Sequence, residues 1–252
     1  MKMAQDEPKS GKRKLSVVVP CYNEAQTLPE IVAAVKSLAS EDLELEVLIV
    51  DDCSTDESLR VAEALSAADP VVRVLRHGLN LGKGAACKTG LLAATGDYVC
   101  IQDADLEYDP RDYLKMLKVM VDEHADVVFG SRYLPQHERR VLRWWHSMMN
   151  KFLTLFSNVM SDMALTDMET CYKLFTAEVV RKIAPRLKER RFGFEPECVA
   201  YVAQGMRRDG WLVHECAIRY RPRTFREGKK IGWRDGLRAL WCIVRYNILE
   251  RG

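Results

Sequence analysis

Short apolar runs alternate with helix-like segments through the first half of the chain, and this alternation restricts the fold more than any other feature. Strands are expected at 15–19, 47–50, 71–75, 98–102 and 126–129, and helices at 28–38, 57–67, 84–94 and 113–121. Strands separated by helices are typical of βαβ units, in which the strands run parallel within one sheet. The sequence therefore predicts an α/β fold with a Rossmann-like, mostly parallel sheet flanked by helices.

The second half of the chain is less regular. Long helices are expected at 141–160 and 233–249, strands at 172–175 and 211–220, and a further helix at 197–204. No internal repeat and no low-complexity linker divides the sequence. We therefore expect a loose basic tail at 1–13, one domain at 14–230 and an amphipathic C-terminal helix at 231–252.

Charge and cysteine content limit the kinds of binding partner, metal site and cellular location that are expected for the protein. The 38 basic and 36 acidic residues nearly balance, but acidic side chains dominate the loops between 51 and 126 and basic ones the stretch from 132 to 251. This division suits a cation in one half and anions in the other, and no nucleic-acid partner is expected. None of the eight cysteines has CxxC spacing, which disfavours zinc and dithiol sites and favours a cytoplasmic location. No run of about 18 apolar residues occurs, so no transmembrane helix is predicted.

Polar side chains follow each of the five strands predicted in the first half. Ligands of open α/β sheets bind beyond the carboxyl ends of the strands, so these groups should meet in one crevice. They are Tyr22, Asn23 and Glu24; Asp51, Asp52, Ser54 and Asp56; Asn80, Gly82, Lys83 and Gly84; Asp103, Asp105 and Glu107; and Ser131 and Arg132. Ser54 or Asp56 could instead cap the following helix. Thr27 is expected to cap the helix at 28–38, with Glu30 in the matching position of a capping box.

Asp103 and Asp105 flank a small alanine directly after a buried strand. Two carboxylates this close repel each other unless a cation lies between them. Mg²⁺ or Mn²⁺ takes one or two carboxylates and completes its shell with water and phosphate oxygens, which neutralises a departing diphosphate. The pair is therefore a candidate metal site, with Glu107 as a further candidate ligand.

Two other loops are candidates for nucleotide contacts. Asp51 and Asp52 follow a similar strand and suit hydrogen bonds to ribose hydroxyls or to a base N–H. Lys83 lies between two glycines just before a helix, where main-chain amides and the helix dipole favour anions. The GxxxxGK[ST] spacing of a P-loop is missing, and 20–24 is not the Gly-rich basic loop of a sugar-phosphate nucleotidyltransferase.

Four motifs, taken in order, carry a resemblance to a known family. They are VVVPCYNE at 17–24, VDDCSTD at 50–56, NLGKG at 80–84 and DADLE at 103–107. Over 14–230 the chain resembles the family-2 inverting glycosyltransferases of the GT-A fold. Within that family it looks most similar to the polyprenyl-phosphate sugar synthases, such as dolichyl-phosphate mannose synthase.

The resemblance implies roles for individual residues. The residues implied to contact the nucleotide sugar are Pro20, Tyr22, Glu24, Asp52, Lys83 and Asp103. The implied metal ligands are Asp103, Asp105 and Glu107. Asp105 and Arg132 are the implied catalytic residues, and Arg132 in the GSR motif at 130–132 would meet an acceptor phosphate. Two positions depart from the family pattern, since Glu107 stands where the synthases often carry Gln and Lys173 where they carry Arg.

Two apolar stripes at helical spacing are relevant to whether the acceptor substrate is a lipid. One comprises Val141, Trp145, Met148, Met149, Phe152, Leu155 and Val159, and the other Trp233, Leu237, Leu240, Trp241, Val244 and Ile248. Stripes with Trp and neighbouring Arg suit a helix lying in a lipid headgroup layer. Helices that only cap the sheet or form a dimer interface would share this pattern.

The acceptor could be a phosphate or a hydroxyl. A lipid monophosphate has a second pKa of about 6 and needs no strong base. Its negatively charged phosphate would be bound by Arg132, Arg143 and Lys173, with Arg223 or Lys229 as further candidates. A hydroxyl needs a carboxylate base, and the candidates are Asp167, Glu169, Glu195 and Glu197.

We favour the phosphate. The expected reaction is transfer of a hexose, mannose or glucose, with inversion, from a GDP- or UDP-linked sugar to polyprenyl phosphate. It would take place in peripheral contact with the cytosolic face of a membrane. The alternative is the same fold acting on a soluble or glycan hydroxyl.

Overall fold

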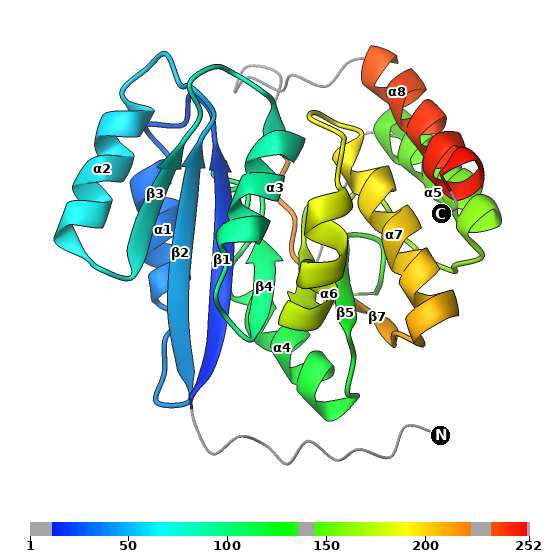
Figure 1. Ribbon diagram of the computed structural model, residues 1–252, viewed down its shortest axis with the longest axis horizontal. Coiled ribbons are helices and arrows are strands. Elements are labelled where there is room, and N and C mark those ends of the chain that lie inside the picture. Colours follow the sequence, from blue (N-terminus) through cyan, green and yellow to red (C-terminus); the bar gives the residue numbers. More distant parts are fainter. Residues whose placement is uncertain (1–11, 136–143, 223–232, 251–252) are drawn as a thin grey trace.

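A single seven-stranded sheet forms the centre of the computed structural model, which describes residues 12–135, 144–222 and 233–250 (Figure 1). The strands are β1 Arg13–Cys21, β2 Leu43–Asp51, β3 Val72–Arg76, β4 Tyr98–Ile101, β5 Val127–Ser131, β6 Lys173–Thr176 and β7 Val213–Ala217. Their order across the sheet is β3-β2-β1-β4-β6-β5-β7. The predicted α/β architecture is confirmed.

Helices cover both faces of this sheet. They are α1 Leu28–Lys36, α2 Ser58–Ala68, α3 Lys83–Ala93, α4 Asp112–Asp122, α5 Trp144–Ser161, α6 Ala177–Ile183, α7 Phe194–Asp209 and α8 Trp233–Val244. A short turn, η1 Ala184–Arg186, follows α6, and α8 continues into a π-helical turn, η3 Arg245–Leu249. α5, α7 and α8 pack on one another beyond the β5 and β7 side of the sheet (Figure 1).

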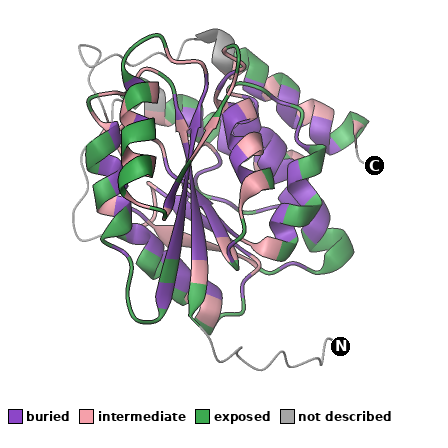
Figure 2. Ribbon diagram, turned by 60° about the vertical axis from the view of Figure 1, so that its left-hand side comes forward, coloured by how far each residue is buried: buried purple, intermediate pink, exposed green. Residues whose placement is uncertain are grey.

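The core lies around the central parallel strands. Most residues of β1 and nearly all residues of β2 are buried, as expected for strands covered on both faces (Figure 2). A strand that is buried on both faces consists of consecutive apolar residues instead of alternating apolar and polar ones. Such apolar runs are easy to recognise in the sequence.

The direction of β6 was not predicted. It runs antiparallel to both of its neighbours, whereas the other strand pairs among the described residues are parallel. β6 therefore enters from the opposite edge of the sheet. This brings the residues just before it, 166–172, to the same edge as the carboxyl ends of β4 and β5.

Some local predictions were wrong. Thr27 precedes α1, but its hydroxyl makes no cap to the helix and donates to the Glu24 carboxylate at 2.8 Å, so the capping box with Glu30 is not formed. Helix α6 was not predicted. β1 begins at Arg13, within the segment expected to be a loose tail, and residues 1–11 of that tail lie outside the described part.

Candidate active site

The loops after β1, β2 and β4 meet at one edge of the sheet. β1 and β2 end in register, at Cys21 and Asp51, and the Gln102 amide after β4 donates to the Val18 carbonyl at 2.8 Å. Each loop turns through a non-glycine residue with positive φ, namely Asn23 at 57°, Cys53 at 60° and Leu106 at 61°. Such backbone costs about 1–3 kcal/mol per residue and is concentrated at functional sites. The three strained turns mark this edge as the candidate site.

Asp52 organises the loop that connects β3 to α3. Its carboxylate accepts hydrogen bonds from the Leu81 amide at 2.9 Å and the Gly82 amide at 2.7 Å, and it contacts His77 Nδ1 at 2.7 Å. The residue is only 2% exposed. Asp52 therefore fixes the conformation of this loop, and its contact with a nucleotide stays a prediction.

The other residues expected near a nucleotide lie close by on the β1 loop. Tyr22 is exposed, whereas Pro20 and Glu24 are half-buried. The Glu24 amide donates to the Ser58 hydroxyl at 2.8 Å, which ties this loop to the start of α2. Asp56 accepts from the Ser58 amide at 2.9 Å, so at least this carboxylate serves the start of the helix.

Lys83 at the start of α3 contacts the acidic loop after β4. Its ammonium lies 2.8 Å from Asp103 Oδ1 and 3.4 Å from Glu195 Oε1. Burial alone would lower the pKa of Lys83, but the negative charges of Asp103 and Glu195 raise it well above its usual value. Lys83 therefore stays charged and supplies positive charge at the Asp103 carboxylate.

Asp105 and Glu107 are held by different parts of the chain. Asp105 Oδ1 accepts from the Glu107 amide at 3.1 Å, while Glu107 Oε2 accepts from the Tyr220 hydroxyl at 2.7 Å. The Arg221 amide donates to the Glu107 carbonyl at 2.8 Å. The acidic loop is thus tied to the segment after β7.

The described residues hold no group of three His, Cys, Asp or Glu side chains already gathered for a metal ion. A hard divalent ion needs only one or two carboxylates from the protein when phosphate and water supply the remaining oxygens. Asp103 and Asp105 are half-buried carboxylates on one loop. Their oxygen donors fit Mg²⁺ or Mn²⁺, and Glu107, whose Oε2 accepts from Tyr220, is a third carboxylate on the same loop.

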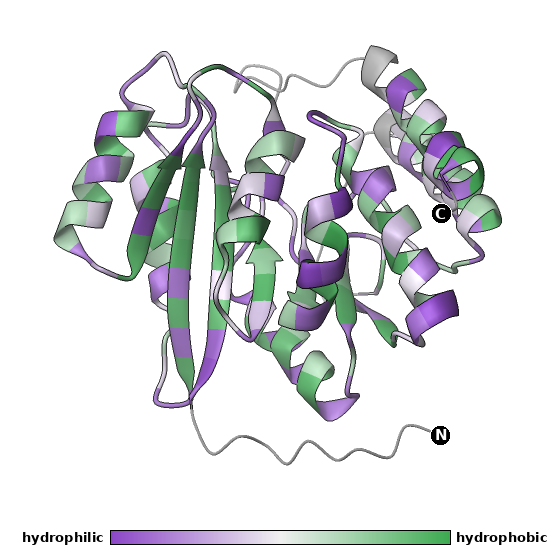
Figure 3. Ribbon diagram, viewed as in Figure 1, coloured by the Kyte–Doolittle hydropathy of each residue, from purple (hydrophilic) through white to green (hydrophobic). Residues whose placement is uncertain are grey.

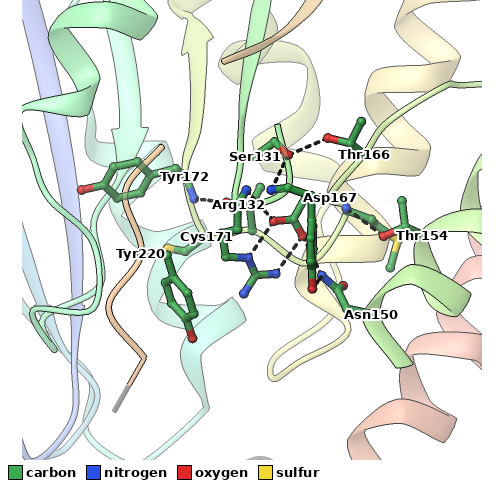
Figure 4. A network of polar contacts seen from close by, with 12 residues as sticks. Ser131, Arg132, Asn150, Thr154, Thr166, Asp167, Cys171, Tyr172 and Tyr220 are labelled. Carbon is green, nitrogen blue, oxygen red and sulfur yellow. Dashed lines mark hydrogen bonds and ion pairs between the residues drawn. The ribbon is translucent and has the colours of Figure 1, made fainter. Parts of the chain in front are cut away.

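Arg132 and Asp167 form a bidentate ion pair at the end of β5 (Figure 4). Arg132 Nε lies 2.6 Å from Asp167 Oδ2 and Nη2 lies 2.7 Å from Oδ1. Asp167 is fully buried and also accepts from Asn150 of α5 at 2.9 Å. The guanidinium carbon lies 5.0 Å from the centre of the Tyr220 ring. Arg132 is therefore oriented by Asp167 and Tyr220, and Asp167 is held in turn by Asn150.

Lys173 does not reach the crevice. Its side chain is fully buried, its ammonium donates to the Thr170 carbonyl, and it lies 5.7 Å from the centre of the Phe129 ring. The prediction that it binds an acceptor phosphate is therefore wrong for this structure, because the antiparallel insertion of β6 turns this position into the interior. Arg143, Arg223 and Lys229 lie outside the described residues.

The four candidate bases differ in their surroundings. Asp167 is held by Arg132, and Glu197 accepts from the amides of Lys188 and Glu189 at 2.8 Å each. Glu169 and Glu195 each keep one buried oxygen without a hydrogen-bond partner among the described residues. Burial and then the charge of Glu195 raise the pKa of Glu169 to about 8, against the opposing effect of Lys173.

Several contributors to this site were missed in the sequence. His77 and Asn150 orient Asp52 and Asp167, and Tyr220 joins Glu107 to Arg132. Of these, only Tyr220 carried a local signal, because it stands between two arginines at the end of the last predicted strand. The partners of His77 and Asn150 are distant in sequence.

Comparisons with known proteins agree with this geometry. Residues 16–184 match the family described as Glycosyl transferase family 2. The chain is 30% identical over 203 residues to a dolichyl-phosphate beta-glucosyltransferase of Dictyostelium discoideum, covering 75% of this chain and 62% of that protein. It is 31% identical over 171 residues to a polyprenol monophosphomannose synthase of Mycolicibacterium smegmatis, covering 66% and 63%. The matches thus span less than two thirds of these relatives' own length.

Solved structures share the fold. Glucosyl-3-phosphoglycerate synthase from Mycobacterium tuberculosis superposes with a TM-score of 0.67 at 17% identity, over 94% of this chain and 79% of that one. Mannosyl-3-phosphoglycerate synthase from Rubrobacter xylanophilus gives 0.69 at 18% identity, over 94% and 75%. At this low sequence identity the structural similarity shows a shared fold and nothing more, and it confirms the predicted GT-A architecture. With the family match over two thirds of its length, the chain belongs to glycosyl transferase family 2.

Proposed function

We propose that the protein transfers a hexose, with inversion, from a nucleotide diphosphate sugar to a polyprenyl-phosphate lipid at a membrane surface. Family membership supports sugar transfer, and the names of two relatives at about 30% identity support a polyprenyl-phosphate acceptor. The observation that supports a lipid acceptor is the distribution of residues on the two sides of helix α5. One side of this helix contacts the anchor of Arg132, and the other side is apolar and exposed.

The donor would bind across the loops after β1, β2, β3 and β4. Mg²⁺ or Mn²⁺ held by Asp103 and Asp105 would neutralise the negative charge that develops on the leaving nucleoside diphosphate. Two crystal structures of the glucosyl-3-phosphoglycerate synthase from Mycobacterium tuberculosis contain UDP, one with Mn²⁺ and the other with Mg²⁺, which supports this assignment. Lys83 adds a fixed positive charge next to Asp103.

The acceptor phosphate would bind at Arg132. Asp167 uses the Nε and Nη2 edge of the guanidinium, and the side chain remains 13% exposed, so donors on its other edge are left for an anion. A phosphate oxygen is already a nucleophile at neutral pH because its second pKa is about 6. The protein then has to position two anions and screen their repulsion, for which a fixed arginine is suited.

Helix α5 carries apolar residues on its exposed side as well as on its buried side, where Leu153 joins the core. Its buried side includes the polar residues Asn150, Thr154, Ser157 and Ser161. Its exposed side carries one lysine, Lys151, among large apolar residues: Trp144, Trp145, Met148, Met149, Phe152, Leu155 and Val159. A surface helix of a water-soluble protein normally exposes polar residues, and a large exposed apolar patch marks an interaction site, so this arrangement supports an apolar environment outside the protein.

Helix α8 packs against α5 and extends the apolar face. Leu237, Trp241, Ile248 and Leu249 are exposed on α8 and its terminal turn, and Figure 3 shows hydrophobic segments on both helices. Within the described residues, no helix is both long and apolar enough to cross a bilayer. The face formed by these exposed residues of α5 and α8 suits shallow insertion at a lipid surface.

Replacing Phe152 by Glu is expected to weaken binding to phospholipid vesicles by about tenfold or more, because it removes one buried aromatic contact and adds a charge. Phe152 is 51% exposed in the free protein, so folding should be unaffected. The measurement is flotation with anionic vesicles. Leu92→Glu on α3 is the matched control, since Leu92 is 56% exposed on another surface. Equal binding by wild type and both variants would contradict membrane contact through α5.

The direct test of the function is an assay with radiolabelled UDP- and GDP-sugars, polyprenyl phosphate and Mn²⁺. Extraction of the labelled sugar into organic solvent is the expected result. The configuration of the new linkage, read by NMR, tests inversion. Label found only in water-soluble glycoside would reject the lipid acceptor.

A hydroxyl acceptor is the second candidate, and Glu169 is the observation that favours it. A carboxylate whose pKa is raised to about 8 is a stronger base than an ordinary one, and Glu169 is half-buried near Arg132. It is mostly protonated at pH 7, so a reaction that used it as a base would become faster as the pH rises through 8.

The pH profile separates the two candidates. For a phosphate acceptor we expect kcat/KM to rise with pH and level off above about 6, where the acceptor becomes dianionic. Glu169→Gln should leave the position of this rise unchanged. A profile that rises only near pH 8, and loses this rise in Glu169→Gln, would instead identify Glu169 as the base for a hydroxyl.

A further inference from the structure

The segment 187–191, here called the strap, lies directly across the start of α3. A Cβ atom at Gly82 would lie 2.4 Å from the Arg190 carbonyl oxygen, and one at Gly84 would lie 2.4 Å from the Glu189 carbonyl oxygen. The Ala85 amide donates to the Arg190 carbonyl at 3.1 Å. The two glycines of the Gly82-Lys83-Gly84 turn thus allow the strap to approach the residue that contacts Asp103.

The strap is anchored on its other side by α8. Glu189, which is buried, accepts from Arg238 Nη2 at 2.8 and 2.9 Å and from the Tyr246 hydroxyl at 3.0 Å. α7 and α3 hold it further, through Glu197 and through Lys88, whose ammonium donates to the Leu187 carbonyl at 2.6 Å. The strap backbone is therefore a fixed platform.

Two neighbouring arginines on this platform are exposed and differ in position. The Arg191 side chain passes over Gly82, with its Cγ 2.6 Å from the place where a Cβ would stand. Its Nη2 reaches Asn80 Oδ1 at 3.5 Å, the limit of a hydrogen bond. The Arg190 side chain has no hydrogen bond or ion pair to another described residue. Arg191 thus extends over the loop that Asp52 organises, next to Lys83.

We infer that Arg191 binds the diphosphate of the nucleotide donor, an inference that rests on the proposed function. Lys83 and Arg132 are both paired with carboxylates, whereas Arg191 has, among the described residues, only its weak contact with Asn80. A diphosphate lying against the Asp103 loop would come within reach of a guanidinium carried over Gly82. Arginine suits this task because its planar fork can bind two phosphate oxygens at once. The fixed strap limits the ordering that binding requires.

The test is calorimetric titration of the whole chain, in the presence of Mn²⁺, with UDP and with GDP. The same titration is then repeated with the corresponding nucleoside monophosphates, and the affinities are compared. Arg191→Met should weaken binding of the nucleoside diphosphate by about tenfold or more, the effect of losing one charge-assisted contact. Binding of the monophosphate should weaken by less than about threefold. Arg191→Lys should fall between wild type and Arg191→Met, because it keeps the charge and loses the fork.

Arg190→Met is the matched control, since it removes the same charge from the next residue while leaving the strap backbone intact. It should change diphosphate affinity by less than about twofold. Equal weakening in both variants would overturn the inference, as would an Arg191→Met variant that raises KM for polyprenyl phosphate and leaves diphosphate affinity unchanged. Failure of the wild type to bind either diphosphate with Mn²⁺ would reject the proposed donor site itself, which is a separate outcome.

Discussion

Asp105→Asn is expected to lower kcat by about a thousandfold or more, which corresponds to about 4 kcal/mol of lost transition-state stabilisation. The substitution removes the negative charge that would hold the metal ion against the leaving diphosphate. It keeps an oxygen that can accept from the Glu107 amide, as Asp105 Oδ1 does at 3.1 Å. Initial rates at saturating Mn²⁺ and nucleotide sugar measure the effect.

The fold of this variant should be preserved, with a melting temperature within a few degrees of wild type. Asp122→Asn on α4 is the control for loss of a carboxylate elsewhere, because Asp122 is half exposed and, in the described part of the chain, forms an ion pair only with Lys118 on the same helix. It should leave kcat unchanged. If Asp105→Asn unfolds the protein, Asp105 is structural and the assignment of a metal ligand is wrong.

Asp167→Ala is expected to lower the free energy of unfolding by about 3–5 kcal/mol, measured by urea denaturation. The change leaves the Arg132 guanidinium, which is only 13% exposed, without its bidentate partner. It also removes the acceptor of Asn150, which makes a 2.9 Å hydrogen bond to Asp167. Most of the cost is that of an uncompensated buried charge.

The double variant Asp167→Ala/Arg132→Met tests this reason. It should be more stable than Asp167→Ala, since no unpaired guanidinium remains. A single-variant cost below about 1 kcal/mol would mean that water already screens the pair. Catalysis should be lost in the double variant, because the proposed ligand of the acceptor phosphate is gone.

The same pair has a defined pH dependence. Burial alone would raise the pKa of Asp167, but Arg132 and Asn150 hold it below its usual value. A lowered folded-state pKa stabilises the protein above the ordinary carboxyl pKa and loses this effect as the pH falls through the folded value. The stability difference between wild type and Asp167→Ala should therefore shrink in acid.

The acidic and glycine-rich loops could be predicted because their signals are local. A buried strand followed by two carboxylates, or a glycine-lysine-glycine turn before a helix, occupies only a few residues, and parallel strands bring their carboxyl ends to one edge. The contact of Lys83 with Asp103 follows from this geometry. Arg132 was also found this way, from a motif at the end of a strand.

The acceptor side could not be derived in the same manner. Lys173 stands where a cationic ligand was expected, but whether its ammonium points outward depends on how β6 enters the sheet. The apolar stripe of α5 predicted a helix and left open which side would be buried. Packing resolved this by burying Asn150 and Thr154 and leaving Phe152 exposed.

By itself, the sequence determined the alternation of strands and helices in the first half of the chain and which polar residues follow each strand, because apolar runs and turn residues act over short stretches of chain. Only the tertiary structure decided which charges are paired, which are buried and what crosses the start of α3. Gly82 and Arg190 are more than a hundred residues apart, and Arg132 and Asp167 are 35 apart. Such contacts depend on the packing of whole helices and strands, which no local pattern encodes.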